Sequence, residues 1–181
     1  MVTIYDIAER TGYSVTTVSK AFNHYTDISD KTRRDILKAA KEMGYLPNAN
    51  ARALTTKKSW TIGVLFAEVL DIGIRHPFFN AIIESFKTEI ETRGYDLLFI
   101  TRDIGGEQIS YLDHCRMRGV DGVIIVCIDY HEREVEELLN SNIPCVMIDL
   151  EEHKKAITVS SDNIMGSSIA VEYLYSIGHR R

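Results

Sequence analysis

The chain has 181 residues, of which 45% are hydrophobic and 26% are charged. These proportions are ordinary for a globular protein, and the length allows one medium domain and one small domain. The sequence contains neither a secretory signal pattern nor an apolar run long enough to span a membrane, which excludes those classes. We therefore expect a cytoplasmic protein with no membrane partner.

The net charge of −5 is unevenly distributed along the chain. Residues 1–60 carry a net charge of +4, whereas residues 61–181 carry −9. Positive charge confined to one segment favours nucleic-acid binding there, and the acidic remainder favours solubility. Lys57 and Lys58, near the end of the positive segment, are either phosphate contacts or solvated linker residues.

Residues 3–23 predict two short helices around a glycine turn, the arrangement that places one helix in the major groove of DNA. Thr3 is a natural N-cap for the first helix, and Asp6 follows three residues later. Gly12 stops this helix where a left-handed backbone is needed. Ser14 caps the second helix, whose core-facing residues are Val18, Ala21 and Phe22. The residues left to face outward on this helix are Val15, Thr16, Thr17, Ser19 and Lys20.

A third helix and a linker follow. Ser29 caps a helix that extends to about Met43, and Gly44 and Pro47 both act as stops. Asn48 is a possible cap for residues 49–55, which have a helix-forming composition but too little length to persist alone.

From residue 61 the pattern changes to short apolar runs alternating with helical segments, which predicts a parallel sheet covered on both faces. The expected strands lie within residues 61–69, 95–103, 121–129, 143–150 and 156–162, and the expected helices span about 77–93, 107–118, 131–142 and 164–177. Ligands of such sheets bind beyond the carboxyl ends of the strands. The polar residues expected there are Asp103, Asp129, Asp149, Ser161 and Asp162.

The cysteines are three in number and lack CxxC spacing. This pattern predicts neither a disulfide framework nor a zinc site, and we expect no metal or cofactor. Cys127 and Cys145 lie in apolar runs and are expected in the core; the third is Cys115.

Several segments carry a resemblance to a known family. They are TIYDIA, GYSVTTVSKAFN, SDKTRRDILKAAKEMGYLPN and ARAL in the first sixty residues, then IGV, HPFF, GVDGVII, IPCVMID and YLYSIGHRR. Over essentially its whole length the chain resembles the lactose-repressor (LacI/GalR) family of bacterial transcription regulators.

The resemblance implies an α/β protein with an all-α helix-turn-helix DNA-binding domain at residues 1–46 and a hinge helix or linker at residues 47–59. Residues 60–181 then form the N-terminal lobe of a periplasmic-binding-protein-like, effector-binding and dimerising domain. The family's effector cleft lies between two lobes, and this chain ends where the first is complete. We therefore expect either a truncated sequence or a natural remnant, with half of the pocket and part of the dimer interface missing.

The resemblance also implies which residues touch DNA. Val15, Thr16 and Lys20 read base edges, and lysine lacks the bidentate fork of the arginine that many relatives have there. Ser14 and Ser29 hold phosphates, cap helices, or do both. The full set of expected DNA contacts is Thr3, Tyr5, Ser14, Val15, Thr16, Thr17, Ser19, Lys20, Asn23, Ser29, Thr32, Tyr45, Asn48, Ala51 and Leu54.

In the family, the hinge segments of two copies fold against each other on DNA and insert a leucine into the minor groove. Leu54 occupies that position, and Ala51 is small enough for the partner to approach closely. Alternatively, Leu54 packs on a neighbouring domain.

The implied effector site uses Phe78 or Phe79 to stack on a sugar or base, with Asp149 and Asp162 as hydrogen-bond acceptors and Asp129 nearby. Otherwise these carboxylates cap helices and turns. The resemblance therefore implies a homodimeric regulator, generally a repressor, that binds a palindromic double-stranded DNA operator under the control of a small-molecule effector, a sugar.

No catalytic motif of the GxSxG, P-loop, HExxH or GxGxxG type occurs, so we expect no enzyme. The alternative class is a ligand-binding or interaction module whose N-terminal helices bind a protein. DNA binding is distinguished from it by an affinity that falls steeply with salt.

Overall fold

The structure is a computed structural model that describes residues 2–23, 25–48, 52–53, 56–66, 73–129 and 131–180. The chain divides into two compact units, Met1–Ser59 and Trp60–Arg181, which are described separately below. Within the described residues, no helix has the length and apolar character that crossing a membrane requires.

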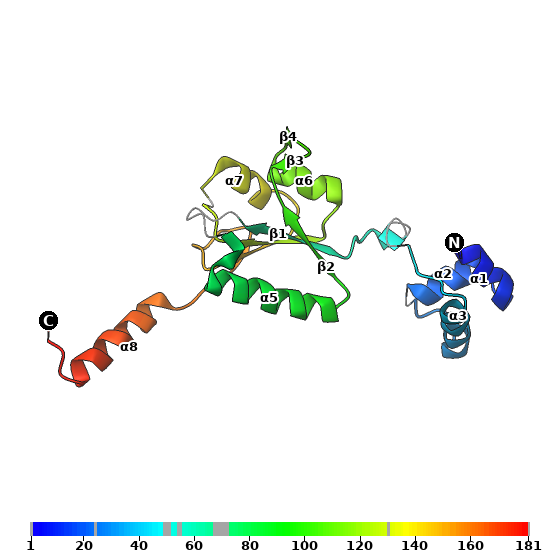
Figure 1. Cartoon of the computed structure of the whole chain (residues 1–181), viewed down its shortest axis with the longest axis horizontal. Coiled ribbons are helices and arrows are strands. Elements are labelled where there is room, and N and C mark those ends of the chain that lie inside the picture. The colour runs from blue at the N-terminus through cyan, green and yellow to red at the C-terminus, as the bar shows by residue number, and fades with distance from the viewer. Residues whose placement is uncertain are drawn as a thin grey trace. The chain divides into compact units, whose positions relative to one another are not determined.

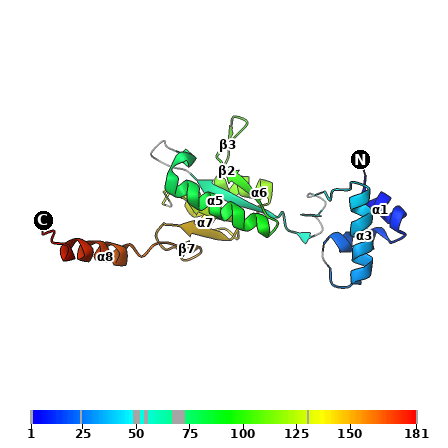
Figure 2. The same ribbon diagram turned by 60° about the horizontal axis from the view of Figure 1, so that its bottom comes forward.

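The N-terminal unit is built from three helices, α1 (Ile4–Thr11), α2 (Val15–Phe22) and α3 (Asp30–Glu42), which Figures 1 and 2 show packed together. One apolar face of each helix is turned inward, and these faces together form a small hydrophobic core. Partly buried aromatic side chains complete this core, and the rings of Phe22 and Tyr45 lie 5.2 Å apart. The buried residues of the cluster are Ile7, Val18, Ala21, Ile36 and Ala40.

Local sequence signals determine where these helices begin and end. At the start of α1, the Thr3 amide donates to Asp6 Oδ2 at 2.7 Å and the Asp6 amide donates to Thr3 Oγ1 at 3.4 Å. This reciprocal capping confirms the expected start, and Gly12 ends α1 in the left-handed region at φ 73°. Helix α3 ends at Glu42, before Gly44 at φ 66°, so Gly44 ends the helix and the expectation that Pro47 does so is wrong.

The second unit contains a five-stranded parallel sheet in the order β2-β1-β5-β6-β7. All five expected strands are present, and the most buried of them lies at the centre of the sheet. Their bounds are β1 (Thr61–Phe66), β2 (Asp96–Ile100), β5 (Gly122–Val126), β6 (Cys145–Ile148) and β7 (Ile157–Val159).

Helices lie on both faces of the sheet, as the pattern predicts. Helix α5 (Pro77–Thr92) covers one face of the sheet (Figures 1 and 2). On this face, Ile83 packs in a cluster with Val64 and Ile124. Helices α6 (Tyr111–Arg118) and α7 (Arg133–Leu139) cover the other face, as Figure 1 shows. Alternate residues of each strand supply the two layers. The larger layer, beneath α6 and α7, includes Leu65, Cys115, Ile125, Val135, Leu138, Leu139 and Met147.

Two features depart from the sequence pattern. Residues 107–108 are strand rather than helix, because β4 (Glu107–Gln108) pairs with β3 (Asp103–Ile104) in an antiparallel hairpin. Helix α6 therefore begins at Tyr111, capped by Ser110. Between α5 and the preceding strand lies a short 3-10 turn, η1 (Gly73–Arg75).

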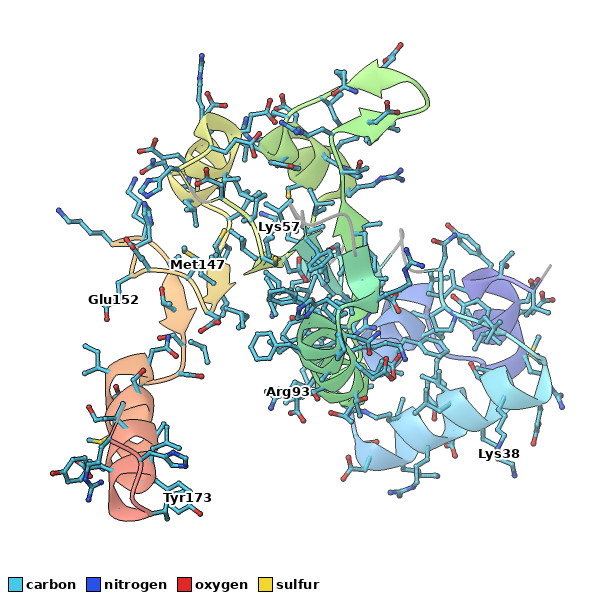
Figure 3. All side chains as sticks on the ribbon, turned by 60° about the vertical axis from the view of Figure 1, so that its left-hand side comes forward. Lys38, Lys57, Arg93, Met147, Glu152 and Tyr173 are labelled. Atoms are coloured by element: carbon cyan, nitrogen blue, oxygen red, sulfur yellow. The ribbon has the colours of Figure 1, made fainter. Side chains whose placement is uncertain are left out.

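The last helix, α8 (Asn163–Ser176), confirms the expected helix at residues 164–177 but contains no buried residue. Its apolar side chains are exposed, among them Tyr173, which Figure 3 labels. Because it buries nothing, α8 adds nothing to the core of this unit.

Candidate nucleic-acid interface

The candidate interface begins at the N-terminus of α2. Ser14 Oγ accepts a hydrogen bond from the Thr17 amide at 3.1 Å, and the two hydroxyls lie 2.9 Å apart. Thr16 is exposed and Val15 is half-buried, so the first turn of the helix presents one polar and one apolar side chain at its surface. A helix N-terminus also carries partial positive charge, which suits a phosphate.

A cavity of about 360 Å³ lies beside this turn, between α2 and the residues that follow α3. Asn23, which lines it from the end of α2, donates through Nδ2 to the Ser19 carbonyl at 3.0 Å. Partial burial raises the pKa of Tyr45 above its ordinary value of 10.0, and this protonated phenol can donate a hydrogen bond. The cavity thus gathers six of the expected DNA contacts, namely Val15, Thr16, Ser19, Asn23, Tyr45 and Asn48.

The same cavity includes residues that the sequence did not single out, above all Arg52. The Arg52 amide donates to the Asn48 carbonyl at 3.0 Å, the spacing of one helical turn. Ala51 and Leu54, the expected hinge contacts, lie outside the described residues.

Lys20, the expected base-reading cation, is engaged in an ion pair. Its ammonium donates to Asp27 Oδ2, in the connection between α2 and α3. This hydrogen bond lowers the pKa of the Asp27 carboxyl, because the ammonium favours its ionised form. Sequence reasoning missed Asp27, because an acidic residue seven positions from a lysine has no preferred geometry until a turn brings the two together.

The remaining expected contacts lie at other helix starts of the N-terminal unit. Ser29 Oγ accepts from the Thr32 amide at 3.1 Å at the start of α3, which repeats the arrangement at α2. Thr3 caps α1, and Tyr5 is 69% exposed on its first turn, so its ring is available to a ligand. None of these four residues lines the cavity beside α2.

A second cavity, of about 660 Å³, lies in the C-terminal unit between α5 and the carboxyl ends of β6 and β7. Phe78 and Asp149 enter it from two different elements, together with Ser160 and Ser161. Asp149 has φ 55°, a backbone conformation that Asp tolerates better than most residues. The aromatic ring, carboxylate and hydroxyls suit a hydroxylated small molecule.

The other expected effector residues lie outside this cavity. Phe79 packs inward, its ring 5.8 Å from Phe66 and 4.9 Å from His76. Asp129 accepts from the His131 amide at 2.9 Å in a turn, and Asp162 accepts from the Met165 amide at 2.8 Å as the N-cap of α8. These two carboxylates have the capping role that the sequence left open. Across the described residues, no group of His, Cys, Asp and Glu side chains could hold a metal ion.

Both units of the chain match known protein families. Residues 3–48 match bacterial regulatory proteins of the lacI family, and residues 59–181 match the periplasmic binding proteins and sugar binding domain of the LacI family. The chain belongs to the LacI family. The boundary between the two matches falls in the segment after the three helices.

Curated relatives of this LacI-family chain are transcription regulators and not enzymes. The HTH-type transcriptional regulator DegA of Bacillus subtilis is 31% identical over 98% of this chain. The HTH-type transcriptional repressor PurR of Vibrio campbellii is 32% identical over 99% of it. The match covers 52% of DegA and 53% of PurR, so the chain spans about half the length of these relatives.

A solved structure of the lac repressor dimer bound to operator and the anti-inducer ONPF has the same fold over the matched region. It is 25% identical, with a TM-score of 0.70, and the match covers 99% of this chain and 54% of that one. A LacI-family transcriptional regulator from Silicibacter pomeroyi, 24% identical, gives a TM-score of 0.63. The helix-turn-helix unit and the parallel-sheet unit are thus the family's architecture.

Proposed function

We propose that this chain belongs to a sequence-specific transcription repressor that binds a palindromic DNA operator as a homodimer. A small-molecule effector, a sugar, controls the DNA affinity of the full-length protein, which acts on operators in the cytoplasm. The observation that carries the proposal is the surface of α2, where Thr16 and Lys20 are accessible on a helix whose other face is locked into a buried core.

The charge and the helix starts of the N-terminal unit support DNA as its partner. A net charge of +4 over residues 1–60 contrasts with −9 in the remainder of the chain. Ser14 and Ser29 each cap a helix whose N-terminus lies at the surface, and each such end suits a phosphate. The side chains at the cavity beside α2 then supply base-edge contacts.

Each segment of the chain has the role that the corresponding segment has in the family. Residues 1–46 bind DNA, residues 47–59 form the hinge, and residues 60–181 form the first lobe of the effector and dimerisation domain. Effector binding to the lobes shifts a population between operator-competent and operator-incompetent states, because the two states bind the ligand with different affinities.

Phe78 and Asp149 are the residues through which the first lobe contacts the effector. Phe78 is 47% exposed, which leaves its ring face open for a sugar to stack on. Asp149, beside Ser160 and Ser161, accepts hydrogen bonds from hydroxyl groups.

Selection of bound duplexes from a random DNA pool tests the proposal. We expect an inverted repeat whose affinity falls steeply with salt, because bound phosphates release counterions. Lys20→Ala should weaken binding to the selected duplex, whereas Lys38→Ala is the matched control. Lys38, on α3 (Figure 3), also pairs with a carboxylate, but its side chain is 78% exposed and it belongs to no expected contact set. If no duplex is preferred even at low salt, the proposal is wrong.

The hinge role of Leu54 has its own test. Leu54→Ala should abolish most of the affinity for the selected duplex and leave the unfolding midpoint unchanged, because a minor-groove wedge contributes only when DNA is bound. Unchanged affinity would show that Leu54 is no wedge.

The effector role is tested by titrating a panel of sugars against the full-length protein with calorimetry. Asp149→Asn should weaken the binding of the preferred sugar by about tenfold or more, since hydrogen bonds to charged groups are the stronger kind. Asparagine tolerates the same backbone conformation, so the fold is preserved. Asp113→Asn on α6 is the control, and an equal effect of both changes would contradict a specific role for Asp149.

A further inference from the structure

Asp27 is held in place by the connection between α2 and α3. The Tyr25 amide donates to the Lys20 carbonyl at 3.2 Å, and Arg33 on α3 donates through its guanidinium to the Tyr25 carbonyl. Ser29, two residues after Asp27, caps α3. The backbone on both sides of Asp27 is therefore anchored, and its carboxylate is brought to the last turn of α2, where Lys20 meets it.

The pair contributes little to folding. The Lys20 and Asp27 side chains are 36% and 53% exposed, and exposed ion pairs between flexible side chains stabilise proteins only weakly. The Lys20–Asp27 pair lies on the helix surface proposed to face DNA. Because it stabilises the fold only weakly, we expect its main effect to be on DNA binding.

The consequence concerns the direction of the N–H groups of the ammonium. A lysine side chain is a flexible stem that ends in three rotatable donors, whereas arginine presents a rigid fork. Asp27 accepts one donor and so restricts both the stem and the rotation of the ammonium. Among the described residues, no other ion pair of Lys20 is present, so two N–H groups remain for a ligand. Guanine offers two acceptors, O6 and N7, at its major-groove edge.

We propose that Asp27 is a positioning residue that sets base discrimination through Lys20, by holding the lysine ammonium with two donors directed at guanine. This inference rests on the proposed function, because it requires α2 to face base edges. The same carboxylate repels nearby phosphates, so Asp27 lowers the affinity for DNA of any sequence while it sharpens the choice of base.

These two effects have opposite signs, and they separate positioning from a merely structural role. A substitution that only loosened the connection between α2 and α3 would weaken binding to every duplex. A substitution that removed the positioning carboxylate would strengthen binding to random-sequence DNA and reduce the preference for the correct base pair.

The experiment uses the full chain and three variants, Asp27→Asn, Asp27→Glu and Glu42→Gln. Asparagine keeps the size of the side chain without its charge, and glutamate restores the charge. Glu42 is the matched control, because it is also an exposed carboxylate paired with a lysine, Lys38, at 55% exposure of its side chain. Affinities are measured by fluorescence anisotropy for the selected duplex, for random-sequence DNA, and for duplexes with each base pair of the half-site replaced in turn. Lys20→Ala identifies the base pair that Lys20 reads.

We expect Asp27→Asn to reduce discrimination at that base pair by about threefold to tenfold, a partial loss of what a good base contact contributes. Affinity for random-sequence DNA should rise, with a steeper salt dependence as the freed ammonium turns to phosphates. Asp27→Glu should retain most of the discrimination, and Glu42→Gln should leave it unchanged.

Three results would overturn the inference. If Asp27→Asn weakened binding to all duplexes equally and lowered the unfolding midpoint, the role of Asp27 would be structural. Glu42→Gln and Asp27→Asn could raise the affinity for random-sequence DNA equally while Asp27→Asn keeps full discrimination between base pairs. That result would show only a general charge effect. Unchanged discrimination in Lys20→Ala would show that Lys20 reads no base, although inverted-repeat binding would still uphold the proposed function.

Discussion

Gly63 on β1 lies directly against the side chain of Ile100 on β2, at a distance that leaves no room for a methyl group. A Cβ added at Gly63 would lie 2.9 Å from Ile100 Cγ1 and 3.3 Å from a methyl group of Val123. The Ile100 side chain therefore occupies the space that a side chain at position 63 would need, so only glycine fits there. This contact helps to pack α6 and the sheet together, because Ile100 belongs to the larger core cluster.

The first prediction follows from this contact. Gly63→Ala should lower the free energy of unfolding by about 1–3 kcal/mol, because the core must shift to accept the extra atom. Gly166→Ala on α8 is the control, since nothing lies within 4 Å of its added Cβ and alanine favours helix. Denaturant unfolding measures both. A Gly63→Ala protein as stable as the parent would show that Ile100 adjusts without cost.

The second prediction concerns the core of the helix-turn-helix unit. Ile36 is fully buried on α3, whereas the adjacent Leu37 is 39% exposed. Ile36→Ala should cost about 2–5 kcal/mol through lost burial and a cavity, and Leu37→Ala much less. Hydrogen exchange read by mass spectrometry should show lost protection in peptides of residues 2–48 and retained protection in the sheet. Loss of protection in both units would contradict their separate cores.

The third prediction concerns the buried thiols. Burial raises the pKa of Cys115 to about 12 and that of Cys145 to about 11. Because the thiolate is the nucleophile, iodoacetamide at pH 8 should leave both unmodified in the folded protein and alkylate them in urea. Cys127, which is half-buried, should react in the folded state. Peptide mass spectrometry distinguishes the three sites, and rapid native alkylation of Cys115 would show that the core opens.

The same shifts predict how stability changes at alkaline pH. In the unfolded chain the Cys115 thiol ionises near its ordinary pKa of 9.0, whereas the folded protein resists ionisation up to about 12. The stabilisation from the neutral thiol is therefore complete below pH 9 and is lost as the pH rises from there through the folded-state pKa. Urea unfolding at pH 8, 9 and 10 should show the decline, and Cys115→Ala should flatten it.

The fourth prediction separates backbone from ligand effects at Asp149. Its φ of 55° lies in the left-handed region, where a Cβ costs about 1–2 kcal/mol and Asp or Asn is less penalised. Asp149→Ala should therefore destabilise the protein, and Asp149→Gly should do so less or not at all. Thermal unfolding without ligand makes the comparison. Equal losses for both variants would point instead to a lost side-chain contact.

The starts of the N-terminal helices and the positions of the five strands of the parallel sheet were determined by the sequence alone, because their causes are local. The Thr3–Asp6 capping box, the left-handed glycine at position 12 and the apolar runs of the five strands act over a few residues. The resemblance to a family likewise depends on short motifs, and it led to the correct fold class.

The tertiary structure decided which side chains come together. Phe78 and Asp149 share a cavity, while Asp129 and Asp162 serve as caps, and no sequence spacing distinguishes the two pairs. Lys20 meets Asp27 only because the connection between two helices turns back on itself. Such contacts join residues across turns and between strands, and their geometry depends on how the whole core packs rather than on any local preference of the chain.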